Sequence, residues 1–295
     1  MRQPLRRAIL VGVDGSAAAL GAVRWAARDA ALRQVPLTLV HVVDAPVPAW
    51  FQSTALADPT HSQERAREFI QSAIAVAEES TGGRGAVQID GKVLHSAVVP
   101  TLVALSREVE MVVVGHRGHG GVVAHSLLGS VSSGLVYRAH CPVAVIHDAA
   151  RAGAAAPVLL GIDGSPASEA ATAIAFEEAS RRGVNLIALH AWADPRVSDS
   201  RKLFQDSEWD AQLSEEEETL AERLAGWHER YPNVQIRRSV EIGDPARWLL
   251  KASERAQLLV VGSHGRGGFA GTLLGSVGAT VVNRAKIPVI VARPS

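Results

Sequence analysis

The chain has 295 residues, a length that fits two domains of ordinary size, each with its own hydrophobic core. Lysine plus arginine and aspartate plus glutamate both number 30, so the net charge is zero, which argues against a nucleic-acid-binding protein. A single cysteine excludes a disulfide framework within the chain and favours a reducing, cytoplasmic environment.

The first half of the chain alternates short β-branched runs with longer segments of helical periodicity. The pattern predicts strands over 8–13, 37–43, 87–94, 111–115 and 143–146, and helices over 16–33, about 62–80, 100–108 and 130–139. The second half repeats this plan, with strands over 158–162, 186–191, 234–240, 258–261 and 289–291, and helices over about 167–182, 206–231, 245–254 and 276–285. Five strands joined by crossover helices predict a parallel, doubly wound α/β sheet in each half.

Three motifs occur once in each half, in the same order. Residues 9–16, 112–118 and 127–131 return as 158–165, 259–265 and 273–277. A duplication of this length indicates two tandem domains rather than a short solenoid repeat. We place the domains at 1–148 and 158–295, separated by a linker at 149–157 that is rich in alanine and ends in proline.

The N-terminus does not resemble a targeting signal. Arg2, Arg6 and Arg7 precede an apolar run at 9–13 that Asp14 ends, which is too short for a signal peptide. No apolar stretch approaches the ~18–20 residues of a membrane span. We therefore expect a soluble cytoplasmic protein that contacts neither membranes nor nucleic acid.

The first predicted strand of each half runs into the motif Gly-[Val/Ile]-Asp-Gly-Ser. It places a carboxylate, Asp14 or Asp163, at the end of the strand. The serines that follow, Ser16 and Ser165, are positioned to cap the next helix. Taken alone, the motif fits an ordinary strand-turn-helix junction equally well.

A longer glycine-rich segment follows the fourth predicted strand and leads into a helix. In the second half it contains Gly262 and Gly265, then nine further residues before Gly275 and Ser276. Glycines let backbone N–H groups turn inward, and a helix N-terminus adds the positive end of its dipole, so the segment suits phosphates. Ser276 either donates to a phosphate oxygen or caps the helix. The segment is neither a Walker A loop nor the dinucleotide fingerprint, which follows a first strand.

Topology brings the two motifs together. In doubly wound sheets of order 2-1-3-4-5 or 3-2-1-4-5, ligands bind at the carboxyl ends of the strands where the winding reverses. If the first and fourth strands are neighbours, Asp14 faces the loop at Gly115, and Asp163 faces the loop at Gly262.

The strand ending in Asp, the glycine loop G-x2-G-x9-G-[S/T] and the closing Pro-Val-x-Val strand resemble the universal stress protein family in its ATP-binding branch. The resemblance covers nearly the whole chain twice, so the chain looks like a tandem-domain member. It implies Rossmann-like domains of the adenine nucleotide alpha hydrolase-like type, one ATP in each domain, and a homodimer. Near-zero net charge also favours self-association.

The resemblance also implies which residues contact the nucleotide. In the family the strand-one Asp and the glycine loop hold ribose and phosphates, and the end of strand two holds adenine through backbone groups. The corresponding residues are Gly12, Asp14, Val40, Gly115, Gly118, Gly129, Ser130 and Val131 in the first half, and Gly161, Asp163, Leu189, Gly262, Gly265, Gly275, Ser276 and Val277 in the second. We add Arg266, which can reach phosphates, and Asp194, which can reach the ribose.

The first loop departs from the family pattern. Ten residues separate Gly118 from Gly129, one more than in the family and in the second half, so the second site is expected to match the family better. A carboxylate beside a triphosphate is repulsive unless it faces the ribose hydroxyls or a Mg²⁺ ion bridges the charges. Either arrangement is compatible with ATP.

Histidines near the predicted sites allow other interpretations. His116, His119 and His125 crowd the first glycine loop, but the second copy offers only His264 there, so we expect no metal site. A histidine also ends the second predicted strand of each half, at 41 and 190, where it either lines the adenine side or packs on its neighbour.

The sequence as a whole predicts an ATP-binding regulator in stress response or growth arrest. We expect binding without fast turnover, because there is no Walker lysine and no arginine finger in both copies. Two alternatives stay open: a slow ATPase or nucleotide-processing enzyme using His116 or Arg266, and an interaction module in which one site is degenerate. A flavin site is disfavoured because no aromatic pair repeats near either crevice.

Overall fold

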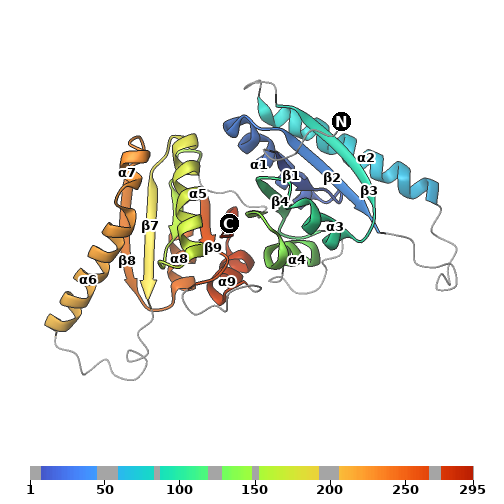
Figure 1. Cartoon of the computed structure of the whole chain (residues 1–295). Helices are drawn as coiled ribbons and strands as arrows, with labels where there is room; N and C mark the ends of the chain where they lie inside the picture. Colours follow the sequence, from blue (N-terminus) through green and yellow to red (C-terminus); the bar gives the residue numbers. More distant parts are fainter. Residues whose placement is uncertain are drawn as a thin grey trace. The chain divides into compact units, whose positions relative to one another are not determined.

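The computed structural model of the protein describes residues 8–44, 59–82, 87–118, 128–147, 153–192, 206–265 and 274–294. The chain divides into two compact units, Met1–Asp148 and Ala149–Ser295. In the first unit, Figure 1 shows α1 and α2 on one face of the sheet and α3 and α4 on the other. Both units are Rossmann-like α/β domains, as predicted, and each is described by itself.

The first unit follows the predicted alternation of strands and helices. Its elements are β1 (Ile9–Gly12), α1 (Ala17–Arg33), β2 (Leu37–Val43), α2 (Pro59–Thr81), β3 (Ile89–His95), α3 (Val98–Leu105), β4 (Met111–Gly115), α4 (Ser130–Arg138) and β5 (Val143–Ile146). The strands are parallel and lie in the order β3-β2-β1-β4-β5. The second of the two strand orders considered from the sequence is therefore the correct one.

The second unit repeats this arrangement. Its elements are β6 (Val158–Gly161), α5 (Pro166–Arg182), β7 (Leu186–Trp192), α6 (Asp206–Leu224), α7 (Trp227–Arg230), β8 (Ile236–Ile242), α8 (Pro245–Ser253), β9 (Leu258–Gly262), α9 (Ser276–Arg284) and β10 (Val289–Ala292). Its strands are also parallel, in the order β8-β7-β6-β9-β10.

Strand register places the site motifs side by side. In the first unit Val11 pairs with Val113, and Gly12 pairs with Val40, so β1 ends between the ends of β2 and β4. Leu160 pairs with Val260 in the second unit, which gives the same arrangement. The winding reverses between the first and fourth strands, which is where a doubly wound sheet binds its ligands.

The central strands are apolar along their whole length because helices cover both faces of each sheet. Leu10, Val112, Leu159 and Val260 are fully buried. Burying one such side chain contributes about 1.5–3 kcal/mol relative to leaving it in water. These strands therefore form a rigid base for the loops at their carboxyl ends.

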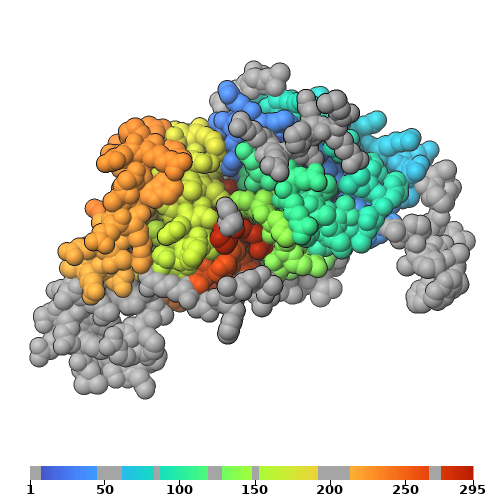
Figure 2. Space-filling view, in the orientation of Figure 1, coloured from blue at the N-terminus to red at the C-terminus, as the bar shows by residue number. Residues whose placement is uncertain are grey.

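One predicted helix is wrong in its extent. The segment 206–231 was expected to be continuous, but α6 ends at Leu224 and a short α7 follows. Gly226, with a φ of 76°, makes the break, since glycine adopts left-handed conformations without steric cost. Stacking of Trp227 on Phe176, with ring centroids 5.1 Å apart, holds α7 against α5. In Figure 2 the orange segment that contains α7 lies beside the yellow-green segment that contains α5.

The third helix of the first unit is also shifted from its prediction. It was expected at 100–108 and lies at Val98–Leu105. Pro100 therefore falls in the first turn, where its missing N–H breaks no intrahelical hydrogen bond. The predicted start of the helix at Pro100 is therefore two residues too late.

Candidate functional site

Each unit contains a cavity at the carboxyl ends of its first and fourth strands. The cavity of the first unit has a volume of about 590 Å³ and that of the second about 490 Å³. Both volumes lie in the range of about 300–1,000 Å³ that small-molecule sites occupy. The two cavities have corresponding positions in the duplicated fold, so they can be compared residue by residue.

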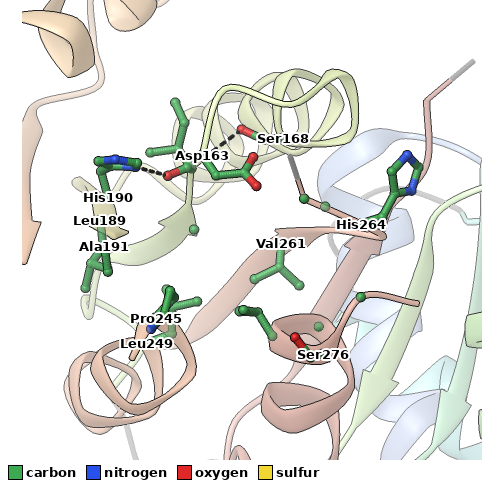
Figure 3. Close-up of a pocket in the computed structure, with 17 residues that line it drawn as sticks. Asp163, Ser168, Leu189, His190, Ala191, Pro245, Leu249, Val261, His264 and Ser276 are labelled. Atoms are coloured by element: carbon green, nitrogen blue, oxygen red, sulfur yellow. Dashed lines mark hydrogen bonds between the residues drawn. The ribbon is translucent and has the colours of Figure 1, made fainter. Parts of the chain in front are cut away.

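The structure brings the predicted site residues of each half together around its cavity. The first cavity is lined by Gly12, Asp14, Val40, Gly115, Gly118, Gly129, Ser130 and Val131. The second is lined by Gly161, Asp163, Leu189, Gly262, Gly265, Gly275, Ser276 and Val277, in part labelled in Figure 3. Asp194 and Arg266 lie outside the described residues. Contact of these residues with a nucleotide stays a prediction.

In the first unit, Ser16 fixes the carboxylate at the end of β1. Oδ1 of Asp14 accepts hydrogen bonds from the backbone N–H of Ser16, at 2.9 Å, and from its hydroxyl, at 2.6 Å. The same hydroxyl oxygen accepts from the backbone N–H of Ala19 at 3.1 Å and so caps α1, which confirms the predicted cap. The carboxylate is therefore held in one orientation at the floor of the cavity.

The second unit uses its serine differently. Oδ1 of Asp163 accepts a hydrogen bond from the backbone N–H of Ser165 at 2.9 Å. The Ser165 hydroxyl caps α5 through the N–H of Ser168 and donates to the carbonyl oxygen of His264 at 3.1 Å. This last bond ties the start of α5 to the glycine loop.

Glycine is required where each fourth strand ends. A Cβ on Gly115 would lie 2.8 Å from the backbone carbonyl carbon of Ala18, and one on Gly262 would lie 2.8 Å from that of Ala167. The first turn of α1 or α5 therefore packs directly on the end of β4 or β9. Only glycine permits this approach of two backbones.

The glycine loop closes on itself before the next helix begins. Gly129 donates its N–H to the carbonyl oxygen of His116 at 3.0 Å, and Gly275 donates to that of Ser263 at 2.7 Å. The start of α4 or α9 is thus held beside the strand that the loop left. The N–H groups of this first turn have no intrahelical partners and carry the positive end of the helix dipole.

The interpretation of Ser276 as a helix cap is wrong. Gly275 occupies the N-cap position of α9, and Ser276 is the first residue inside the helix. Figure 3 shows the Ser276 side chain at the edge of the cavity. The other interpretation, a hydroxyl that donates to a bound phosphate, remains as a prediction.

The predicted adenine end of each cavity is formed by the second strand. The carbonyl oxygens of Val40 and Leu189 already accept hydrogen bonds from Val13 and Ile162, at 2.9 and 3.0 Å. Each carbonyl oxygen has a second lone pair that remains for a base.

The strand-end histidines line the cavities and also pack on their neighbours, so both of their expected roles are compatible with the structure. Nδ1 of His41 donates to the carbonyl oxygen of Val13, and Nδ1 of His190 donates to that of Ile162, both at 2.7 Å. The other contacts differ: the His41 ring meets Phe69 edge to face, whereas Nε2 of His190 lies 3.3 Å from a carboxylate oxygen of Glu216. Each histidine ties the second strand to the first.

The opposite wall of each cavity was missed by the sequence analysis. It is formed by Val98 and Leu102 of α3 in the first unit and by Pro245 and Leu249 of α8 in the second. A sequence signal was present, since these residues occupy positions i and i+4 of a helix at equivalent places in both copies. They supply an apolar surface facing the ends of the first two strands.

The histidines of the first glycine loop were not expected to form a metal site. Among residues that the structure describes, no group of three or more His, Cys, Asp or Glu side chains is placed to hold a metal ion. The His116 ring packs against the His147 ring at an angle of 34°, with centroids 4.4 Å apart, while His119 and His125 lie outside the described residues. The expectation that the loop holds no metal stays a prediction.

Fold and site together define a class: tandem Rossmann-like domains, each with a cavity between an aspartate-bearing first strand and a glycine loop. The model of the universal stress protein family matches residues 6–147 and 156–293. The chain belongs to the universal stress protein family.

Several known proteins are similar to this chain. The chain is 52% identical over 291 residues to the universal stress protein Rv2623 of Mycobacterium tuberculosis, covering 97% of this chain and 96% of that protein. It shares its fold with a universal stress protein from Archaeoglobus fulgidus, with 21% identity, 98% of both chains covered and a TM-score of 0.69. A further match is a universal stress protein solved in complex with cAMP, with 24% identity, 49% of this chain and 99% of that chain covered, and a TM-score of 0.38.

In the described parts of this chain, no helix is both long enough and apolar enough to cross a membrane.

Proposed function

We propose that each domain binds one ATP and that occupancy of the two sites regulates the protein in stress response or growth arrest. One observation carries the proposal: the same arrangement is built twice. In each copy an aspartate at the end of the first strand faces a glycine loop, and the loop leads into a helix N-terminus over a cavity with an apolar wall.

The lining residues suit the parts of an adenine nucleotide. The base fits between the strand-two end at Leu189 and the apolar wall at Leu249, and the corresponding residues in the first unit are Val40 and Leu102. The loop glycines and the helix N-terminus present N–H groups to phosphates. A hydrogen bond to a charged group is worth about 1.5–3 kcal/mol, so several such bonds account for retention of a nucleotide.

The aspartates fit a site that also takes Mg²⁺. A magnesium ion prefers carboxylate oxygens together with phosphate oxygens. Asp14 and Asp163 are the carboxylates among the described lining residues, and each would hold the ion or the ribose hydroxyls. Bound there, the ion offsets the repulsion between the carboxylate and the triphosphate.

The proposal is of binding rather than rapid hydrolysis, because the chain has no Walker A motif.

We further propose that the protein acts in the cytoplasm and as a homodimer. The single cysteine supports the first point, and the zero net charge supports the second. Sedimentation equilibrium tests the dimer, which a monomer at all accessible concentrations contradicts.

The test is the nucleotide content of the purified protein, released by denaturation and separated by ion-exchange chromatography. We expect one adenine nucleotide per domain. The variant Asp163→Ala, Gly262→Ala should lose the nucleotide of the second site, and Asp14→Ala, Gly115→Ala should lose that of the first. Asp163→Ala alone keeps the test independent of the packing change at residue 262, and Gly153→Ala is the matched control, since nothing lies within 4 Å of its added Cβ.

Each outcome has a distinct meaning. Absence of nucleotide in the purified protein, with no uptake of added Mg-ATP, contradicts the proposal and leaves an interaction module. Occupancy of the second site alone indicates that the longer first loop has disabled its site. Release of ADP that continues to accumulate from added ATP indicates an enzyme.

A further inference from the structure

The two cavities differ at one position of the glycine loop. The residue immediately before the second loop glycine is Arg117 in the first copy and His264 in the second. Both residues line their cavities. The loop glycines that line the cavities are shared by the two copies, whereas this position changes the charge of the loop.

Arg117 brings a permanent positive charge to the first cavity. The other ionisable residues that line this cavity in the described part of the chain are Asp14 and His41. A guanidinium group carries a full positive charge and five N–H donors, whereas a neutral imidazole carries one donor and one acceptor. Within the described ranges Arg117 makes no hydrogen bond or ion pair that would occupy it.

His264 is engaged with its neighbour instead. Its Nδ1 lies 3.0 Å from the hydroxyl oxygen of Ser263, the residue that replaces His116 of the first copy. Figure 3 shows its ring pointing away from Val261 and Ser276, two residues that line the second cavity. The second loop therefore presents no fixed charge at this position.

The backbone places Arg117 beside the start of α4. A Cβ on Gly129, the N-cap residue of that helix, would lie 3.4 Å from the Cα of Arg117. The full charge of the arginine thus adds to the partial positive charge of the helix N-terminus. An arginine so placed can bind two phosphate oxygens at once through its planar guanidinium.

We infer that Arg117 makes the first site selective for the charge of the phosphate chain, so that the affinity of this site rises steeply from adenosine to ATP. The inference rests on the proposed nucleotide binding and assigns the selectivity of one of its two sites. The ligand class is the nucleoside 5′-polyphosphates.

The test compares the ratio of ATP affinity to adenosine affinity at each site by isothermal titration calorimetry of the full-length chain. The first site is measured in an Asp163→Ala background and the second in an Asp14→Ala background. Arg117→His, which installs the residue of the second copy, should lower the ratio at the first site about tenfold or more, as expected for loss of a hydrogen bond to a charged group. His264→Arg should raise the ratio at the second site.

Two further variants separate charge from folding. Arg117→Lys keeps the positive charge and should retain most of the ratio, whereas Arg117→Gln removes the charge and should lower the ratio as Arg117→His does. An unchanged ratio in both Arg117→His and Arg117→Gln, with ATP still bound, overturns this inference and leaves the proposed function intact. Failure of the parent chain to bind ATP or adenosine at either site contradicts the proposed function itself.

Discussion

The carboxylate of Asp163 packs directly against the backbone of Gly265, and Asp14 and Gly118 repeat this contact in the first unit. In both copies a Cβ on the glycine would collide with Oδ2 of the aspartate. The glycine loop thus passes over the carboxylate at the end of the first strand with no room for a side chain. Figure 3 shows the Asp163 side chain extending from the end of β6 toward the segment that carries His264.

Gly265→Ala should therefore destabilise the second unit by about 1–3 kcal/mol, the usual cost of an overpacked contact. Asp163→Ala removes the carboxylate that the new Cβ meets. The double variant should consequently be more stable than the sum of the two single changes predicts. Urea unfolding of the four proteins completes the cycle, and strict additivity would show that the contact is not the source of the cost.

The serines at the starts of α1 and α5 should differ in what their loss does. Ser16→Ala and Ser165→Ala each remove an N-cap, which costs about 0.5–2 kcal/mol. Ser165→Ala also removes the bond to the His264 carbonyl, so it should lower ATP affinity through the glycine loop, whereas Ser16→Ala acts through Asp14. Thermal unfolding and calorimetric titration measure both effects. Equal stability of Ser165→Ala and the parent chain would argue against the cap.

The apolar wall gives a third prediction. Leu249 is 3% exposed and Leu102 is 2% exposed, so replacing either by alanine should destabilise its unit. We expect about 2–3 kcal/mol, the lower part of the range for buried leucines, because the existing cavity leaves fewer contacts to lose. Adenosine affinity should fall together with ATP affinity, since the proposed function puts the base against this wall. A loss confined to ATP would place the base elsewhere.

The strand-end histidines supply a fourth prediction. His41→Ala and His190→Ala each leave a backbone carbonyl without its 2.7 Å partner, a loss that costs about 1–3 kcal/mol when the group is buried. His190 is 1% exposed while His41 is half-buried, so the change in the second unit should cost more. Denaturant unfolding of the two variants tests the difference, and the reverse order would contradict it.

The sequence analysis names polar residues and glycines that line each cavity, and it misses the apolar wall. Asp163 and Gly262 stand out because a carboxylate and a glycine are unexpected at the end of a buried strand. Leu249 does not stand out, because an apolar residue on the buried side of a helix looks the same whether it meets another side chain or a cavity. Only the repeat of its spacing at Leu102 distinguishes it.

The wrong predictions have local causes. The predicted helix 206–231 includes Gly226, since a helical pattern tolerates an isolated glycine, but stacking of Trp227 on Phe176 favours the break. Ser276 was read as a possible cap because serine is common there, whereas Gly275 takes the N-cap position. The extents of the helices depended on contacts that the sequence pattern does not contain.

The hydrogen bond from Ser165 to the His264 carbonyl has a consequence for the timing of motions in the second unit. Any movement that takes the His264 carbonyl away from α5 breaks this bond, and the serine that caps α5 then loses one of the contacts that orient it. Exchange of the first amide protons of α5 with solvent should therefore be coupled to the position of the His264 carbonyl. Ser16 hydrogen-bonds to Asp14 instead. The exchange rate of the first amides of α1 should therefore be independent of the glycine loop of the first unit.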